Sequence, residues 1–126
     1  MFDHLSLGVR DLGAARQFYD AFLEPLGHAI VSASGVELAY GRGGVGAQFY
    51  LYPVAPEREP AGAGTHIAFT APSRRAVDGA YAAAIGQGAS SVRAAGPHPD
   101  IAADYYGAIL IDPDGNRLEI VLDTMH

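Results

Sequence analysis

The chain contains no cysteine and no lysine among its 126 residues. Without thiolates, any metal ion must be held by histidine, aspartate, glutamate or water, which argues against structural sites of the zinc-finger type. The net charge of −6 comes with no cluster of basic residues. We therefore expect no nucleic-acid partner, because phosphate neutralisation needs grouped basic side chains.

Long apolar runs are also missing. None approaches the roughly 20 residues that a helix needs to span a bilayer, so we expect no membrane partner. The N-terminal stretch "MFDHLSLGVRDL" has neither a basic region nor an uninterrupted apolar region of the kind found in signal peptides, and this predicts a cytoplasmic protein. A chain of 126 residues is long enough for one domain but short for two separate cores.

Strand-like and helix-like patterns alternate in an order that repeats, which predicts an α+β domain of two tandem βαβββ modules. Module one is expected over about residues 1–54 and module two over about 65–126, joined by the Pro- and Gly-rich stretch 55–64. The expected helices span residues 12–27 and 73–88. The expected strands span residues 3–9, 28–34, 36–41 and 47–53, and then 65–71, 90–95, 105–111 and 117–123.

Each module's first strand places a histidine at the start of a face made of small or polar residues. Side chains alternate across a strand, so His4 shares a face with Ser6, and His66 with Ala68, while the intervening apolar residues face the helices. In the final strand the same alternation places Glu119 on the polar face. These positions are either a solvated sheet face or a site of two imidazoles and one carboxylate, a set favoured by Fe(II) and compatible with other divalent ions.

The stretches "DHLSLGVRDL", "THIAFTA" and "DPDGNRLEIV", with the doubled βαβββ order, resemble the vicinal oxygen chelate superfamily. This superfamily includes glyoxalase I, bleomycin-resistance proteins, fosfomycin-resistance thiol transferases and extradiol dioxygenases. The resemblance covers essentially the whole chain. It implies that the two modules form a curved, incompletely closed mixed sheet around a cavity.

The resemblance implies a metal site in which His4, His66 and Glu119 hold one divalent ion, whether Fe, Mn, Ni, Co or Zn. The last strand of module one departs from the family pattern, because "AQFYLYP" contains no carboxylate where glyoxalase I usually has Glu or Gln. Gln48 or Tyr50 could occupy that position, and the sequence alone leaves the choice open.

Two functions follow as hypotheses. The first is a metalloenzyme in which the ion chelates a small oxygenated substrate for lyase, isomerase, dioxygenase or thiol-transfer chemistry, with Glu119 as catalytic base. The second is a metal-free, bleomycin-resistance-like protein that binds an antibiotic or another small molecule. The resemblance also implies a homodimer, with the site either within one chain or across two.

Further side chains are expected to bind the substrate or to lie at the surface. The expected substrate-binding residues are Gln48, Tyr50, Tyr105 and Tyr106, and tyrosines can stack on flat ligands. Tyr105 and Tyr106 are consecutive, so one should reach the cavity and the other the core. The remaining histidines, expected in ordinary surface or loop positions, are His28, His98 and His126.

Overall fold

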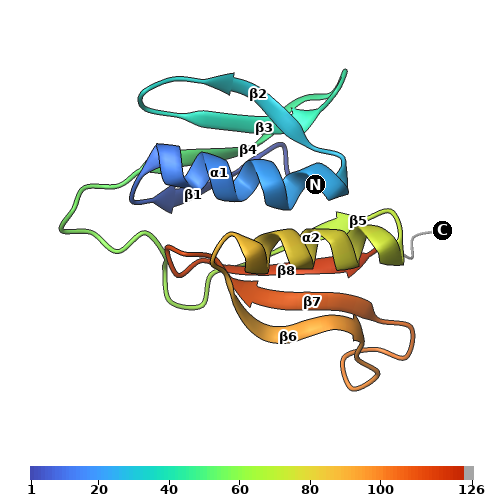
Figure 1. The fold of residues 1–126 in the computed structure, drawn as a ribbon. Coiled ribbons are helices and arrows are strands. Elements are labelled where there is room, and N and C mark those ends of the chain that lie inside the picture. Colours follow the sequence, from blue (N-terminus) through green and yellow to red (C-terminus); the bar gives the residue numbers. More distant parts are fainter. Residues whose placement is uncertain (124–126) are drawn as a thin grey trace.

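The computed structural model describes residues 1–123, so His126 lies outside the described part of the chain. Within that part, eight strands and two α-helices follow one another in the predicted order (Figure 1). Module one contains β1 (Leu5–Val9), α1 (Leu12–Leu23), β2 (Ala29–Ala33), β3 (Leu38–Arg42) and β4 (Gly46–Pro53). Module two contains β5 (His66–Ala71), α2 (Arg74–Gly86), β6 (Ser90–Pro97), β7 (Tyr106–Ile111) and β8 (Arg117–Leu122).

The first helix is shorter than the pattern predicts. α1 ends at Leu23, and the chain continues as a short 3₁₀ helix, η1 (Glu24–Leu26). Pro25 lies within this segment and has no backbone N–H to continue the α-helical hydrogen bonds. Gly27 then closes the turn at a positive φ of 89°, where glycine is favoured.

Each module forms its own four-stranded mixed sheet, in the orders β1-β4-β3-β2 and β5-β8-β7-β6. The first and last strands of each module pair in parallel, and the other pairs are antiparallel. The predicted fold class is therefore confirmed, with the curved sheet divided into two. In Figure 1, α1 and α2 lie side by side in front of the strands, with β2 and β3 of module one above them and β6 and β7 of module two below.

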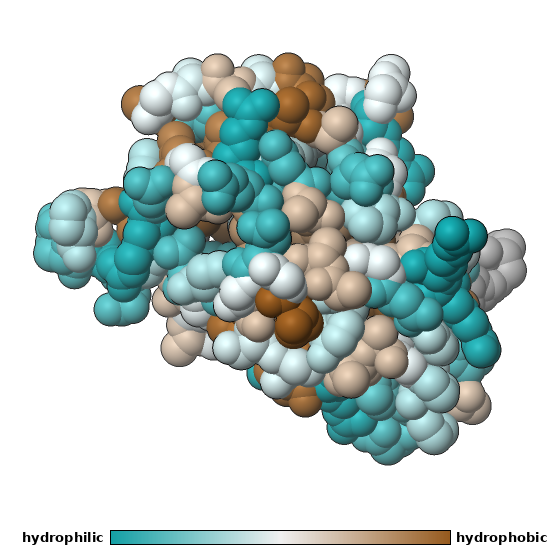
Figure 2. Space-filling model, in the orientation of Figure 1, coloured by the Kyte–Doolittle hydropathy of each residue, from teal (hydrophilic) through white to brown (hydrophobic). Residues whose placement is uncertain are grey.

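The alternation predicted along the strands is present in both modules. Val9 of β1 and Leu118 and Ile120 of β8 are fully buried, whereas Leu5 and Leu122 at the strand ends are partly buried. The module cores meet through aromatic rings, because Phe69 of β5 contacts both Phe22 of α1 and Phe49 of β4. The face of the molecule that carries both helices is mostly hydrophilic, with small hydrophobic groups scattered over it (Figure 2). No helix among residues 1–123 is long and apolar enough to cross a membrane.

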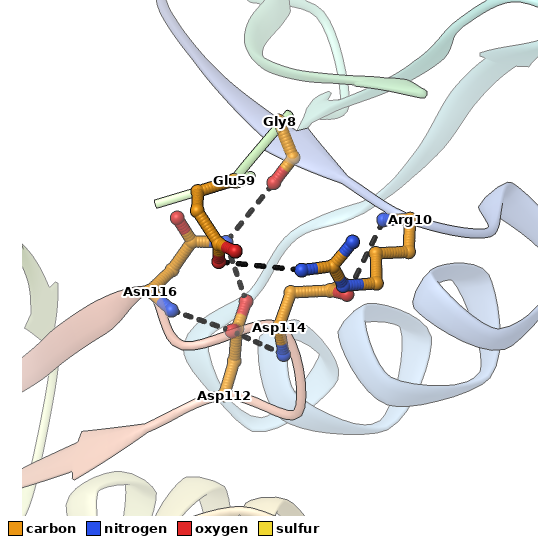
Figure 3. Close-up of polar contacts among 6 residues, drawn as sticks. All are labelled: Gly8, Arg10, Glu59, Asp112, Asp114 and Asn116. Atoms are coloured by element: carbon orange, nitrogen blue, oxygen red, sulfur yellow. Dashed lines mark hydrogen bonds and ion pairs between the residues drawn. The ribbon is translucent and has the colours of Figure 1, made fainter. Parts of the chain in front are cut away.

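A buried polar cluster joins the β7–β8 turn of module two to module one. The Asp112 carboxylate, 4% exposed, accepts hydrogen bonds from the Tyr19 hydroxyl of α1, from the Asn116 amide, and from the backbone N–H groups of Asp114 and Asn116. Asn116 also donates to the carbonyl of Gly8 in β1 at 3.1 Å (Figure 3). The turn at "DPDGN" between β7 and β8 therefore also ties the start of β8 to the end of β1.

Candidate functional site

The polar face of module two brings His66 and Glu119 together. In the parallel β5–β8 pair, Ala68 lies opposite Glu119, and His66 stands two residues earlier on the same face. His66 Nε2 lies 2.9 Å from Glu119 Oε1. The Glu119 side chain is only 16% exposed, whereas that of His66 is 36% exposed. The carboxylate is thus sheltered, while the imidazole remains accessible.

Tyr105 forms a hydrogen bond with the second oxygen of the Glu119 carboxylate. Its hydroxyl donates to Glu119 Oε2 at 2.8 Å. Burial, and then the hydrogen bond to Glu119, raise the pKa of Tyr105 far above its ordinary value of 10, so the phenol stays protonated and keeps donating. Gly107 makes room for this arrangement, because a Cβ at that position would lie 2.7 Å from the Tyr105 hydroxyl oxygen.

Module one has the same framework with different chemistry. In the β1–β4 pair, Ser6 lies opposite Tyr50, just as Ala68 lies opposite Glu119 in module two. Tyr50, and not Gln48, is therefore the structural counterpart of Glu119, which resolves the choice that the sequence leaves open. The ring of His4 meets the edge of Tyr50 at a centroid distance of 5.3 Å, and His4 Nδ1 lies 2.6 Å from Asp3 Oδ1.

His4 and His66 lie at opposite ends of the boundary along which β1 of module one faces β5 of module two, which we call the seam. A cavity at this seam is lined by His4 together with Ala68 and Thr70, at the end of β5. At the other end, Gly8 of β1 accepts from Asn116, the neighbour of Arg117, which pairs with His66. His4 and Gly8 are roughly 13 Å apart along the strand, because each strand residue rises about 3.3 Å.

The positions of His4, His66 and Glu119 determine how many ligands one chain can offer to a single metal ion. Two donors that each lie about 2.1 Å from one ion, at a right angle, are about 3 Å apart, so the His66 and Glu119 atoms suit adjoining coordination positions. His4 lies too far along the seam to join them. Residues 1–123 accordingly contain no group of three histidine, aspartate or glutamate side chains that could hold an ion. The donor types fit a divalent metal, but a single chain supplies only two of the three together.

The other expected substrate-binding residues lie in different places. Gln48 is exposed and lines the seam cavity. Tyr105 is on the polar face, as described above. Tyr106 is on the helix face, where its hydroxyl donates to Asp78 of α2 and its ring lies under the Arg74 guanidinium. The expectation that the two tyrosines take opposite faces is therefore met, although Tyr106 packs at the surface of α2 and is not in the core.

Sequence reasoning missed His28. It was expected in an ordinary surface position, yet its half-buried side chain lines the seam cavity. Burial, and then the charge of Arg42, lower the pKa of His28 below its usual 6.5. The only sequence signal was its place between a helix and an edge strand, which does not distinguish a cavity wall from a loop.

Two mixed sheets built from βαβββ modules, with a histidine and a carboxylate on one polar face, define a class of paired-module folds. The chain belongs to the Glyoxalase/Bleomycin resistance protein/Dioxygenase superfamily, whose family model matches residues 1–120. No curated protein matches the chain significantly.

Solved structures agree with this membership. A glyoxalase/bleomycin resistance protein from Albidiferax ferrireducens T118 is 31% identical, with a TM-score of 0.83, over 97% of this chain and 98% of that one. A glyoxalase-related enzyme from Fulvimarina pelagi is 21% identical, with a TM-score of 0.73, over 98% and 88%. A family enzyme from Burkholderia phytofirmans PsJN is 21% identical, with a TM-score of 0.71, over 95% and 96%. The last two show likeness of fold alone.

Proposed function

We propose that the protein is a glyoxalase-superfamily metalloenzyme that acts on a small oxygenated substrate at a centre built around His66 and Glu119. The observation that carries this proposal is the 2.9 Å separation of His66 Nε2 and Glu119 Oε1, which suits two adjoining ligands of one divalent ion. The third ligand of the proposal is His4 of a second copy of the chain. The ion is Fe, Mn, Ni, Co or Zn, all of which accept imidazole and carboxylate donors.

The positions of these residues support a homodimer as part of the proposal. One chain offers His66 with Glu119 at one end of the seam and His4 at the other. A twofold dimer that joins unlike ends makes two equal sites, each with His4 from one chain and His66 with Glu119 from its partner. The supporting observation is that, among residues 1–123 of one chain, His4 does not form a metal-holding group with His66 and Glu119.

The chain's own residues suggest a division of labour. A bound divalent ion supplies a Lewis acid for the oxygen atoms of the substrate. Glu119 is the base of the proposal, because its sheltered carboxylate lies beside an accessible imidazole, and Oε1 would take the proton only once it was released from the ion that it would hold. Tyr105 stays protonated and holds Glu119 Oε2, which fixes the direction of the other oxygen.

Mixed dimers provide the decisive experiment. His4→Ala and Glu119→Ala chains are each loaded with Mn, Fe, Co, Ni or Zn, and metal per chain is measured before and after the two chains are unfolded together and refolded. Each variant alone should bind no metal. A mixed dimer with sites across two chains regains one intact site, so an equal mixture should recover about a quarter of the wild-type metal, given random pairing in a twofold dimer.

Matched variants separate a lost ligand from a damaged fold. Glu37→Ala removes a carboxylate that accepts from Tyr52 on the polar face of module one, and His98→Ala removes a histidine whose ring bonds the Ala94 carbonyl and packs on Tyr105. Both should keep wild-type metal. No recovery in the mixture, with wild-type protein that binds metal, would contradict the two-chain site. Wild-type protein that binds none of the five metals would contradict the metalloenzyme.

One observation favours a second function, metal-free binding of a planar compound. The rings of Tyr50 and Tyr52 are nearly parallel, 11° apart in plane and 6.3 Å between centroids, and Tyr52 is 39% exposed. Such rings can stack on a flat ligand. For this alternative we expect aromatic compounds to quench tyrosine fluorescence equally with and without a chelator, and Tyr50→Leu to abolish the quenching.

A further inference from the structure

A cavity of about 240 Å³ lies at the seam of the two modules, lined on β5 by the residues from Ile67 to Thr70. Its apolar wall combines both modules, since Phe49 of β4 meets Phe69 of β5 edge to face at 5.3 Å. Further apolar lining includes Leu5, Leu23 and Ile67. His66, Glu119 and Tyr105 do not line the cavity, although Ala68, which does, lies opposite Glu119 in the β5–β8 pair.

Three polar side chains with unused hydrogen-bonding capacity stand around this apolar wall. The side chains of His28, Gln48 and Thr70 line the cavity, and none of them forms a hydrogen bond with any residue in the part of the chain that the structure describes. Burial keeps the imidazole of His28 neutral at pH 7, so it can both donate and accept. An apolar body with a few convergent polar groups is the usual design of a small-molecule site.

The volume and the charge of the cavity restrict the class of ligand that it can bind. A dry cavity of about 150 Å³ lined by apolar side chains accommodates benzene, whereas drug-sized ligands need roughly 300 Å³ or more. The present volume falls between these limits. Among residues 1–123, no arginine lines the cavity, and the only carboxylate in its lining, Asp3, already lies beside His4. An anionic ligand would therefore lose its hydration without an arginine in the cavity wall to pair with.

We infer that the seam cavity binds an uncharged compound of about one ring, with its apolar body against Phe49 and Phe69 and its hydroxyl or similar group at Gln48, His28 and Thr70. The inference does not depend on the metal, because the wall and the polar groups are complete within one chain. His4 at the rim places this ligand beside module one's part of the proposed centre.

Phenol is the probe, and benzoate, of similar size but charged, is its comparator. Titration of ¹⁵N-labelled full-length protein should move the backbone amide signals of β4, β5 and the Gly27–His28 turn with one common saturation curve. Phenol should bind at least about tenfold more tightly than benzoate, which corresponds to about 1.4 kcal/mol. Absence of saturable shifts, shifts centred elsewhere, or equal binding of benzoate would each overturn the inference.

Two variants locate the probe within the cavity. Ile67→Phe adds bulk to the wall and should weaken phenol binding at least about tenfold. Its matched control, Ile85→Phe, makes the same change at an exposed position on α2 and should bind as wild type. Gln48→Leu keeps the size but removes the amide, so it should weaken phenol and leave toluene unchanged. If Ile67→Phe retains a well-dispersed spectrum and full phenol affinity, the cavity is not the site; if it does not fold, the wild-type titration and Gln48→Leu still decide.

Discussion

The two modules share one arrangement of strands and helix but carry different side chains on their polar faces. Module two pairs Tyr105, just before β7, with Glu119 on β8 beside His66. Module one also has a tyrosine–glutamate pair, but there Tyr52 lies on the last strand and donates to Glu37, just before β3. In module one, Tyr50 of the last strand thus stands beside the histidine where module two has Glu119, and the carboxylate that contacts His4 is that of its chain neighbour Asp3.

This difference shows which features a structural repeat preserves. The strand order, the parallel pairing of first and last strands and the capped helix are the same in both modules. The side chains that differ between the polar faces, such as Tyr50 and Glu119, are not among the core residues, so they can change without loss of the fold. One module can then pair a carboxylate of its last strand with its histidine, while the other has a tyrosine at that position.

The largest effect is expected where the modules are joined. Asp112→Ala removes an acceptor from four buried or partly buried donors, including the Tyr19 hydroxyl and the Asn116 amide. Unpaired buried donors lose their hydration without replacement, so the free energy of unfolding should fall by about 3 kcal/mol. Urea unfolding measures the change.

The neighbouring carboxylate provides the control for that change. Asp114 accepts a single hydrogen bond of 3.2 Å, from the backbone N–H of Arg10, and its side chain is not fully buried. Asp114→Ala should therefore cost less than about 1 kcal/mol. Equal losses of unfolding free energy in the two variants would mean that the hydrogen bonds to Asp112 do not join the two modules.

Most of the fold could be predicted from the sequence, because period-two alternation, two helical patterns and turn residues all agree. The helix end near Pro25 was less predictable, since a 3₁₀ turn keeps the same apolar spacing as the last turn of an α-helix. The polar-face assignments of His66 and Glu119 followed from parity alone. Their contact required the register of β5 against β8, which turn lengths and core packing set together.

Other parts of the site could not be read from the sequence. The position of Tyr50 opposite Ser6 depends on strand register, as does its equivalence to Glu119. The separation of His4 from His66 depends on how the modules pack, because β1 and β5 run in opposite directions along the seam. Local patterns carry no information about that packing. The same holds for the burial of His28 at the seam.

A second, smaller effect is expected at Gly107, which lets Tyr105 reach Glu119. Gly107→Ala places a methyl group against the Tyr105 ring and the backbone carbonyl of Ile120. Overpacking of this kind costs about 2 kcal/mol, and the hydrogen bond to Glu119 should be lost. The same substitution at Gly35, where a Cβ meets open space, should leave stability nearly unchanged. Urea unfolding, with the Tyr105 hydroxyl signal by NMR, distinguishes strain at Gly107 from a general intolerance of alanine.

The helix caps should show the modules as equivalent. Asp11 accepts from the Ala14 N–H at 2.8 Å, and Ser73 accepts from the Ala76 N–H at 3.0 Å. Replacement of either cap by alanine should lower the free energy of unfolding by about 1 kcal/mol. The two losses should agree within error by urea unfolding. A markedly larger loss at one cap would show that the module whose helix it begins is the less stable partner.

The smallest effect is expected at the residue that precedes each edge strand, where the two modules again differ. Module one has His28 before β2, and module two has Ala89 before β6. Burial lowers the pKa of His28 in the folded protein, so the unfolded chain binds its proton more readily. Stability should therefore decrease as the pH falls below the ordinary histidine pKa of 6.5, and His28→Ala should remove that part of the decrease. Urea unfolding of both proteins at about pH 7.5 and about pH 5.5, on either side of that value, measures the difference. If wild type and variant lose the same stability between these conditions, the proton is not excluded by the cavity wall, and His28 is as accessible in the fold as in the unfolded chain.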